Sequence, residues 1–518
     1  MPSRKFFGRC SVAMVMTTLL AVGIAVGGPM LIDWAINSGI AESISYDNED
    51  TDAYKAWITN EDGKGVPWYK LMYFYNLTNA DAWLRGEEKP HVEEIGPFHY
   101  DEYRVHFNVS ITGKEDSRIN YQSYIYYVYN EEKSCDGCAE DIALTTVNPA
   151  YLGVGGSVSE QLAPLGIGGT GWTQLGINML GASLNESLVR TLTPAQIAFG
   201  FDDPMLAFVS GLLNSTGQEA PPPTFQGVQP NMTSKDDAFP YSAQATGSPK
   251  IEDVFEYEIF RAAAKQTYWN SSEANALKGT DGSQFHPQVK KSQNVTVFVD
   301  DVFRSISFYY KEETEHKDIH MYRFIIQTEQ FKNASQVPDH AAYYMFGPHG
   351  VINLTTASQF APVIASNPHF LDADPFYLEQ VSGVSPPSFE KHGTYLDIEP
   401  LSGTTMKARK RLQVNVHVKP RLLTYQDLIE AFVPVMWVEE GAEVTDKLAA
   451  KFRSKVYLAL TLKQIFLWGG AVIAGVLAVF TVWSILIWRR KKRADEEPFS
   501  AVPSRSQRLI NPTINEAS

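Results

Sequence analysis

Residues 411–419, Arg-Leu-Gln-Val-Asn-Val-His-Val-Lys, alternate strictly between polar and apolar side chains. A period of two places the apolar residues on one face of an extended chain, so this stretch predicts a β-strand that is buried on one side. Four further segments are rich in Val, Ile, Tyr and Phe and also predict strands. They are 103–112, 120–129, 295–310 and 321–328.

Signals for helices are fewer and lie close together. Thr193, Pro194 and Gln196 have the arrangement of a helix start, with an N-cap, a proline at the first helical position and a capping-box glutamine. The hydrophobic stretch 195–213 follows, and we expect a helical subregion over about 145–213. The expected fold class is therefore α+β, with one large and mainly antiparallel sheet.

Two stretches without a charged residue, 10–32 and 464–488, predict transmembrane helices. At 1.5 Å per residue the shorter one covers roughly 35 Å, which is enough to cross the hydrocarbon core of a bilayer. Basic residues gather on the cytoplasmic side of membranes, and Arg-Arg-Lys-Lys-Arg follows the second stretch, so both termini are expected in the cytosol. The predicted parts are a cytoplasmic N-terminus at 1–9, spans at 10–32 and 464–488, an ectodomain at 33–463 and a cytoplasmic tail at 489–518.

A cleaved signal peptide is the alternative for residues 10–32. Their apolar run is longer than the about 7–15 residues usual in such peptides, and no clear small-x-small cleavage site follows it. These features favour a retained membrane anchor. The stretch 464–488 has no comparable rival interpretation.

The charge balance also separates the termini from the middle of the chain. The net charge of −15 argues against nucleic acid as the main partner. Residues 33–463 carry 34 basic and 55 acidic side chains, whereas 489–518 carry seven basic and four acidic ones. The two parts are therefore expected to face different environments.

Nine sequons for N-linked glycosylation lie between the two uncharged stretches, and none lies outside them. This excess over chance, confined to one part of the chain, indicates an ectodomain in the secretory pathway. The asparagines are Asn76, Asn108, Asn185, Asn214, Asn231, Asn270, Asn294, Asn333 and Asn353.

Several motifs occur in order along the chain. Residues 73–79, Tyr-Phe-Tyr-Asn-Leu-Thr-Asn, lead into 90–100, Pro-His-Val-Glu-Glu-Ile-Gly-Pro-Phe-His-Tyr. The longest motif is 392–403, His-Gly-Thr-Tyr-Leu-Asp-Ile-Glu-Pro-Leu-Ser-Gly. The set is completed by 199–206, 303–306, 321–324, 411–415, 433–437 and 452–454. Together they resemble the class B scavenger receptors, particularly their lysosomal integral membrane protein branch. The resemblance covers nearly the whole chain.

The resemblance implies an asymmetric β-barrel ectodomain with a helical cap and a hydrophobic tunnel running from the cap toward the membrane. Residues 145–213 would form this cap and are called the apical region below. The expected function is a scavenger-type receptor that binds lipid and transfers it through the tunnel. Its partners would be a fatty acid, a sterol, a phospholipid or a lipoprotein, and no cofactor is expected. A lipid gains roughly 0.8 kcal/mol per methylene buried in an apolar channel, so covalent chemistry is not needed.

Some relatives attract anionic ligands through lysines on the apical helices, and this chain departs from them. Residues 134–234 contain one basic residue, Arg190, against eight acids. An apolar lipid entry is the alternative, although packing between apical helices explains the same side chains equally well. The candidate entry residues are Leu162, Leu165, Trp172, Leu175, Ile177, Met179 and Leu180.

The cysteines are a second departure, because the family commonly has several disulfides in the second half of the ectodomain. This chain has no cysteine after Cys138. Cys135 and Cys138 are expected to form a small local disulfide in an oxidising lumen. A redox CxxC would need thioredoxin-like surroundings and structural zinc needs four ligands, so no metal site is expected.

Enzyme activity is not expected. Asp397 and Glu399 lie two apart, so on a strand they could share a face as paired catalytic carboxylates. No nucleophile or metal-ligand set accompanies them, and the resemblance implies structural roles.

Leu509 and Ile510 in the tail resemble the dileucine sorting signal of the lysosomal branch. The acidic residue usual four positions earlier is replaced by Arg505, and such apolar pairs also occur by chance. A sorting adaptor remains an expected partner, and both the plasma membrane and the lysosomal membrane remain open as locations.

The competing hypothesis is a receptor that escorts a lysosomal hydrolase and releases it at acid pH. Histidine protonation would be the natural switch, and His91, His99 and His106 fall in one stretch. Ordinary strand faces could hold the same histidines.

Overall fold

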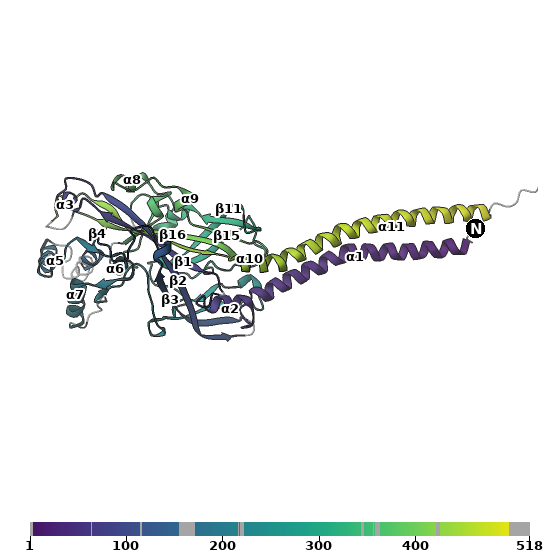
Figure 1. Ribbon diagram of the computed structural model, residues 1–518, viewed down its shortest axis with the longest axis horizontal. Coiled ribbons are helices and arrows are strands. Elements are labelled where there is room, and N and C mark those ends of the chain that lie inside the picture. Colours follow the sequence, from purple (N-terminus) through teal and green to yellow (C-terminus); the bar gives the residue numbers. More distant parts are fainter. Residues whose placement is uncertain are drawn as a thin grey trace, which may run out of the picture. The chain divides into compact units, whose positions relative to one another are not determined.

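The structure is a computed structural model, and it describes residues 4–63, 65–113, 116–154, 171–215, 217, 222–342, 347–355, 357, 363–420 and 425–496. The chain divides into two compact units, residues 38–453 and a smaller unit made of 1–37 and 454–518. The larger unit contains the strands and the short helices, and the two long helices make up most of the smaller one (Figure 1).

The described helices are α1 (Arg4–Ile44), α2 (Asp52–Ile58), α3 (Ala80–Leu84), α5 (Gly171–Ser183), α6 (Pro194–Phe199), α7 (Pro204–Ser215), α8 (Pro375–Glu379), α9 (Phe389–His392), α10 (Asp446–Phe452) and α11 (Leu458–Glu496). The strands are β1 (Trp68–Leu77), β2 (Val92–Thr112), β3 (Arg118–Tyr129), β4 (Leu144–Val147), β5 (Val189–Leu192), β6 (Phe201–Asp202), β7 (Thr224–Phe225), β8 (Phe239–Ala245), β9 (Tyr257–Ile259), β10 (Val295–Val299), β11 (Arg304–His316), β12 (Ile319–Ile326), β13 (Val351–Asn353), β14 (Val363–Ser366), β15 (Tyr395–Ile398), β16 (Thr405–Val418) and β17 (Ala431–Glu443).

Most strands form one antiparallel sheet in the order β10-β11-β12-β15-β16-β17-β1-β2-β3-β8-β9, and β14 adds to β16. The two ends of this order are bridged. Tyr257 of β9 donates its N–H to the Gly279 carbonyl at 3.0 Å, and Phe298 of β10 donates to the Thr280 carbonyl at 2.9 Å. The sheet is therefore a nearly closed barrel, which confirms the predicted α+β class and its barrel-like sheet.

The pairing register identifies the inner face of this barrel. Lys410 of β16 lies opposite Glu440 of β17, which in turn lies opposite Lys70 of β1. Asp301, in the connection between β10 and β11, reaches Lys410 with Oδ2 2.7 Å from Nζ. Three strands, β11, β12 and β15, separate these residues in the sheet, so the contact crosses the concave side. Lys410, Glu440 and Lys70 therefore point inward.

The stretch 411–419 lies in β16, which is buried on both faces, so the prediction of a half-buried strand is wrong. Gln413 and Asn415 are fully buried. Tyr75 donates its hydroxyl to Gln413 Oε1 at 3.2 Å, and Asn415 donates Nδ2–H to Ser366 Oγ at 3.0 Å. These hydrogen bonds remove the penalty for burying a polar group, so polar residues occupy the second face as well.

The segment 295–310 is also corrected, because it is a hairpin of β10 and β11 and not one strand. Residues 300–302 form a 3-10 turn, and Phe303 has a left-handed φ of 53°. The turn brings Val297 opposite Ile306. Since strand-like residues flank the turn on both sides, composition alone did not indicate the break.

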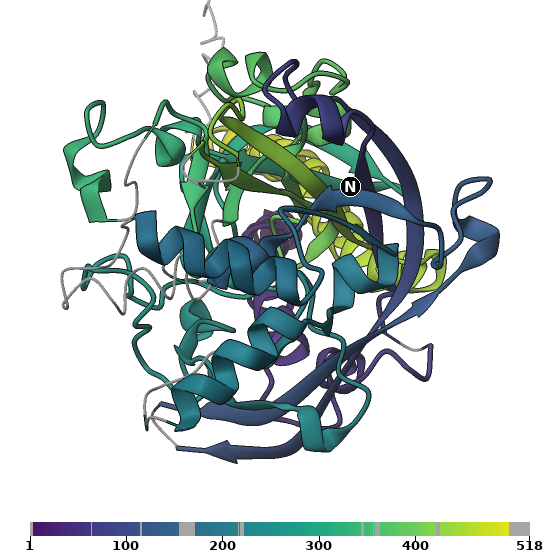
Figure 2. The same cartoon turned by 90° about the vertical axis from the view of Figure 1, so that its left-hand side faces the viewer.

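The apical region contains strands as well as helices. β4 and β5 pair with each other, and Thr193 and Gln196 form the predicted capping box at the start of α6. Gly200, at φ 106°, ends α6, and Asp203 Oδ1 accepts from the Leu206 N–H at 2.9 Å as α7 begins. The stretch 195–213 is therefore two helices. Figure 2 shows the apical helices in front of the sheet.

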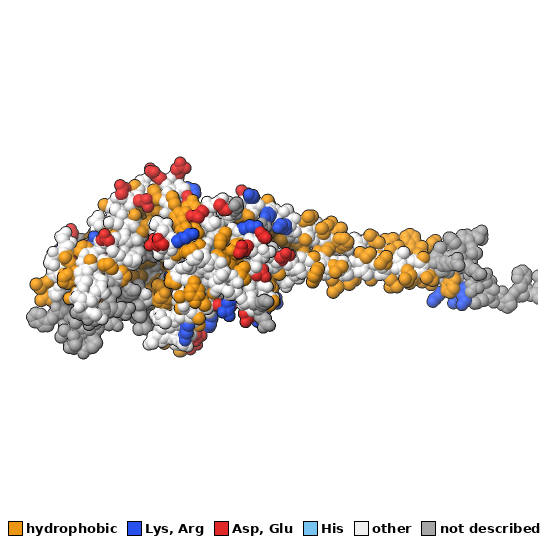
Figure 3. Space-filling model, turned by 90° about the horizontal axis from the view of Figure 1, so that it is seen from below, with side chains coloured by type: hydrophobic (Ala, Val, Ile, Leu, Met, Phe, Trp, Pro, Cys, Tyr) orange, Lys and Arg blue, Asp and Glu red, His pale blue; other side chains and the backbone are white. Residues whose placement is uncertain are grey.

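In the smaller unit, α1 and α11 lie side by side. A side chain added at Gly470 would come within 2.8 Å of the Ala25 Cβ, and Thr18 Oγ1 lies 2.9 Å from Thr481 Oγ1. Small residues allow such close approach between membrane helices. Two helical segments are long and apolar enough to cross a bilayer, Val12–Ile44 with a mean hydropathy of 2.0 and Asp446–Arg493 with 2.4. Apolar side chains predominate on the face of the helical pair that Figure 3 shows.

Candidate functional site

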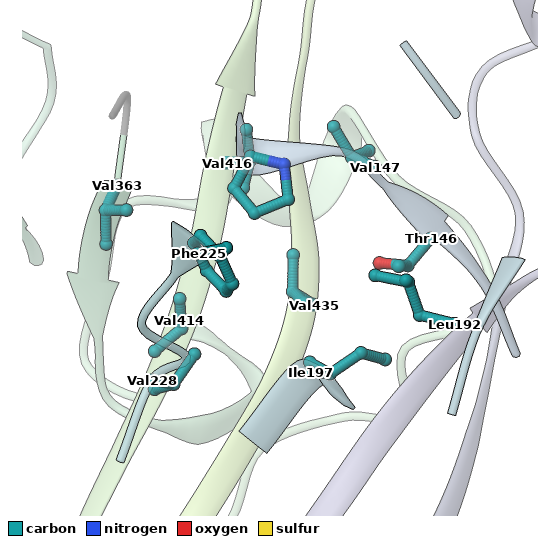
Figure 4. Close-up of a pocket in the computed structure, with 11 residues that line it drawn as sticks. Thr146, Val147, Leu192, Ile197, Phe225, Val228, Val363, Val414, Val416 and Val435 are labelled. Atoms are coloured by element: carbon teal, nitrogen blue, oxygen red, sulfur yellow. The ribbon is translucent and has the colours of Figure 1, made fainter. Parts of the chain in front are cut away.

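An apolar cavity lies where β16 and β17 meet the apical region. The cavity is small and partly open to solvent. Among the described residues that line it, Thr146 alone has a polar side chain. Figure 4 shows these side chains surrounding one space, and they come from six strands, two helices and one connection. They are Thr146, Val147, Pro149, Leu192, Ile197, Phe225, Val228, Val363, Val414, Val416 and Val435.

A crossing of two backbone segments positions one wall of the cavity. Gly227 has φ 77°, and a Cβ there would lie 2.5 Å from the Ala198 carbonyl oxygen, so a side chain does not fit. The same carbonyl accepts from the N–H groups of Val228 and Gln229, each at 2.9 Å. The crossing thus holds Val228 at the cavity, while Gln229 Oε1 accepts from Lys70 Nζ at 2.6 Å.

The inner face of the barrel is layered along β16, β17 and β1. From the cavity, the layers are Val414–Met436–Phe74, Leu412–Val438–Met72 and Lys410–Glu440–Lys70. The two apolar layers are closely packed, and Phe74, Met72 and Met436 are fully buried. Successive layers are two residues apart, so the charged layer lies about 13 Å along β16 from Val414.

Six side chains form what we call the ion-pair chain: Asp301, Lys410, Glu440, Lys70, Arg104 and Glu102. Lys410 Nζ lies 3.0 Å from Glu440 Oε2, beyond its contact with Asp301. Glu440 also pairs with Lys70 Nζ at 3.1 Å and with Arg104 at 2.9 Å. Arg104 Nε then reaches Glu102 Oε1 at 2.6 Å. The three cations and three carboxylates of this set balance in charge.

The pKa values of the ion-pair chain are set by competition between burial and neighbouring charge. Burial acts to raise the pKa of Glu440, but Lys410, Lys70 and Arg104 outweigh it and hold this pKa well below its usual value. Burial acts to lower the pKa of Lys70, and Tyr127 and Glu440 outweigh it in the same way. Glu440 and Lys70 therefore stay ionised at neutral pH, because each charge stabilises its neighbours.

The candidate entry residues do not form one surface. Leu162 and Leu165 lie outside the described residues, as does the side chain of Trp172. Leu175 and Met179 are exposed on one side of α5. Ile177 is buried and Leu180 packs against the core, because they lie on the other side of this helix.

Two exposed apolar residues of α7 were missed by the sequence analysis. Phe208 is 51 % exposed and Leu212 is 54 % exposed. Their spacing of four places them on one helix face, and this spacing was the available signal. Within the described apical region they accompany Leu175 and Met179 as exposed large apolar side chains.

The nine sequon asparagines are all described, and none is buried. Asn108, Asn185, Asn214, Asn231, Asn270 and Asn294 are exposed, and Asn76, Asn333 and Asn353 are half-buried. Cys135 and Cys138 lie with their Cα atoms 5.2 Å apart and their sulfur atoms joined.

The three histidines of the acid-switch hypothesis have separate surroundings. His106 stacks on Trp57 with ring centroids 4.2 Å apart, and its Nδ1 lies 2.7 Å from the Trp57 carbonyl. Burial lowers the pKa of His106 to about 4, and burial also lowers the pKa of His99. His91 Nδ1 lies 3.0 Å from Ser382 Oγ. His106 and His99 therefore resist protonation and do not support this switch.

The two carboxylates considered for catalysis have other partners. Arg323 donates from Nε and Nη2 to the two oxygens of Asp397, both at 2.8 Å. Glu399 accepts from the N–H and hydroxyl of Ser402, at 2.8 and 2.7 Å. These contacts are structural.

Across the described residues, no group of three or more His, Cys, Asp or Glu could hold a metal ion. Leu509 and Ile510, the pair that resembles a sorting signal, lie outside the described residues.

Comparison with known proteins gives one family. The sequence model of the CD36 family matches residues 14–485. Scavenger receptor class B member 1 of Bos taurus is 26 % identical over 395 residues, covering 76 % of this chain and 74 % of the relative. Lysosome membrane protein 2 of Homo sapiens is 25 % identical over 467 residues, covering 88 % and 91 %. Sensory neuron membrane protein 1 of Ostrinia furnacalis is 26 % identical over 474 residues, covering 86 % and 84 %.

Proposed function

This chain belongs to the CD36 family, and on that premise we propose that it is a two-pass membrane receptor that binds lipid in the apical cavity and transfers it through the barrel. The observation that carries the proposal is the cavity itself, which has one polar lining side chain among eleven residues. An apolar lining of this kind favours hydrocarbon groups of a lipid over water, because each buried methylene contributes roughly 0.8 kcal/mol. The partners would be fatty acids, sterols, phospholipids or lipoprotein lipids.

The exposed apolar side chains of α5 and α7 support contact with a lipid surface. Leu175, Met179, Phe208 and Leu212 are all at least one-third exposed. The one basic residue of this part of the chain, Arg190, pairs with Glu186 at 2.9 Å and with Asp203 at 3.1 Å. Capture would therefore depend on apolar contact and not on a cationic patch.

Lipid uptake by cells tests the proposal. Val228→Phe places a larger side chain in the cavity, and we expect it to reduce uptake of a labelled lipid from particles. Val128→Phe makes the same change at a site that is 47 % exposed, and should leave uptake unchanged. Uptake is compared at equal surface amounts of receptor. Equal uptake by wild type and Val228→Phe would contradict lipid binding in this cavity.

The membrane arrangement belongs to the same proposal. Residues 33–463 would form a glycosylated lumenal or extracellular ectodomain between spans at 10–32 and 464–488, with cytosolic termini at 1–9 and 489–518. Cys135 and Cys138 would form a disulfide on the oxidising side.

Glycosidase treatment should lower the apparent mass, and the nine single Asn→Gln variants should each lose at most one glycan. Protease added outside intact cells should spare an epitope at either terminus. Cleavage of that epitope would contradict the topology.

The cargo-receptor hypothesis ranks second. Its support is the relative named lysosome membrane protein 2, together with the Leu509–Ile510 pair as a sorting signal for an adaptor. A hydrolase that binds at neutral pH and dissociates at acid pH would favour it. The surroundings of His106 argue against the histidine switch first considered for such release.

A further inference from the structure

The path proposed for lipid meets a layer of charge inside the barrel. The apical cavity and the ion-pair chain lie on the same inward faces of β16 and β17, with the packed Leu412–Val438–Met72 layer between them. Val414 lines the cavity and Lys410 carries charge two layers away, with Leu412 between them on the same face of β16. A lipid that moves along these strands therefore reaches the ion-pair chain after about 13 Å.

The ion-pair chain extends across the interior and not only along one wall. Asp301 belongs to the β10–β11 connection, whereas Glu102 belongs to β2. Lys410, Glu440, Lys70, Arg104 and Glu102 follow the neighbouring strands β16, β17, β1 and β2, and the Asp301–Lys410 contact crosses the interior from the β10–β11 connection. A hydrocarbon chain that follows β16, β17 and β1 inside the barrel therefore meets charge at this layer.

Part of the charged layer reaches water while the rest is dry. The side chains of Lys410 and Asp301 keep 31 % and 19 % of their surface exposed, whereas Lys70 and Glu102 keep 3 % and 1 %. Hydrocarbon is unfavourable beside either group, because it must leave apolar surroundings and also disturb paired charges. The layer thus opposes passage of the same apolar chains that the cavity favours.

We infer that the ion-pair chain is a gate that separates the apical cavity from the remainder of the barrel and limits the rate at which lipid passes. This inference rests on the proposed function and concerns transfer, not binding. Because the three cations and three carboxylates of the set balance, the gate offers no unpaired cation to a fatty-acid carboxylate. Neither the hydrocarbon chain nor an anionic headgroup is stabilised at this layer, so opening requires the ion pairs to separate.

The Lys410–Asp301 pair is the part of the gate that can be removed with the least damage. Replacing both residues leaves the Glu440 contacts with Lys70 and Arg104 in place and keeps the charge of the layer balanced. Buried ion pairs can often be replaced by apolar residues without loss of stability, whereas removal of one partner is costly. Lys410→Met with Asp301→Leu is therefore the test variant.

The matched control starts from the same strand, β16, but from its opposite face. Arg409 of β16 pairs with Glu443 of β17 at 2.9 Å, and both residues point out of the barrel. Arg409→Met with Glu443→Leu makes the same chemical change outside the lumen.

A second test variant, Lys410→Gln with Asp301→Asn, removes the charges but keeps polar side chains. It replaces Lys410→Met with Asp301→Leu if that variant does not fold.

The experiment uses full-length protein in proteoliposomes and measures two quantities, equilibrium binding of a fluorescent sterol and its rate of transfer from donor particles. We expect the test variant to transfer about tenfold faster, which corresponds to a barrier lowered by about 1.4 kcal/mol. Its binding should stay within about twofold of wild type, and the control should change neither quantity. An unchanged or slower transfer rate with binding retained overturns the gate. A wild type that binds no sterol or other labelled lipid overturns the proposed function, and the gate with it.

Discussion

Glu440 links three cations inside the barrel, since Lys410, Lys70 and Arg104 all contact it. Glu440→Gln leaves these cations without their shared carboxylate, and we expect a loss of about 3–5 kcal/mol of stability. Thermal unfolding in detergent measures this loss. Glu87→Gln is the control, because Glu87 pairs with Arg85 at an exposed site and its loss should shift Tm little. Equal Tm values for the two variants would contradict the role given to Glu440.

His106 makes a separate prediction about pH. Its folded-state pKa is about 4, below the value of 6.5 expected in the unfolded chain. The unfolded chain therefore binds more protons between these values, and stability falls as the pH drops from about 6.5 toward 4. His106→Phe keeps a ring beside Trp57 but cannot titrate, so the decrease in Tm over this range should become smaller. An unchanged pH dependence in the variant would show that His106 is not a source of acid sensitivity.

Glu440 titrates in the same sense as a surface carboxylate, but its pKa is much lower. Its depressed pKa means that its contribution is present above about pH 4.3, the usual value for Glu, and is lost as the pH falls further toward the folded-state value. The ion-pair chain should therefore remain intact at the mildly acid pH of endosomes and lysosomes. The proposed gate is accordingly not an acid-operated device.

At the scale of elements, the crossing at Gly227 positions the wall of the cavity. Gly227→Ala would place a methyl group 2.5 Å from the Ala198 oxygen at a positive φ, so the two segments must separate. We expect a lower Tm and reduced lipid binding, because Val228 moves with the crossing. Gly211→Ala is the control, since Gly211 lies in α7 with open space around it and alanine favours helix by up to about 1 kcal/mol. Matching losses in both variants would contradict the prediction.

Element positions could be predicted from the sequence where the signal was local. The capping box at Thr193 and Gln196 marked the start of α6, and residue types marked the strands. The break at 300–302 and the second buried face of β16 depend on contacts with distant parts of the chain. Gln413 and Asn415 suggested exposure by type, and their hydrogen-bond partners Tyr75 and Ser366 lie far away in sequence.

At the scale of the whole molecule, the motifs and the two apolar stretches were sufficient to predict the family, the barrel and the two membrane helices. The cavity was not predictable, because valines such as Val414 and Val416 have the same pattern whether they enclose a core or a space. The ion-pair chain was missed for a related reason. Its members lie in separate strands, and only the register of the barrel brings Lys70, Lys410 and Glu440 together.

Mass spectrometry of lipids extracted from the purified, glycosylated full-length protein tests the central claim most directly. The account predicts a fatty acid, sterol or phospholipid at close to one molecule per protein, and a clear reduction of this lipid in Val228→Phe relative to Val128→Phe. A folded wild-type protein without bound lipid, or the same lipid content in both variants, would contradict lipid binding in the apical cavity.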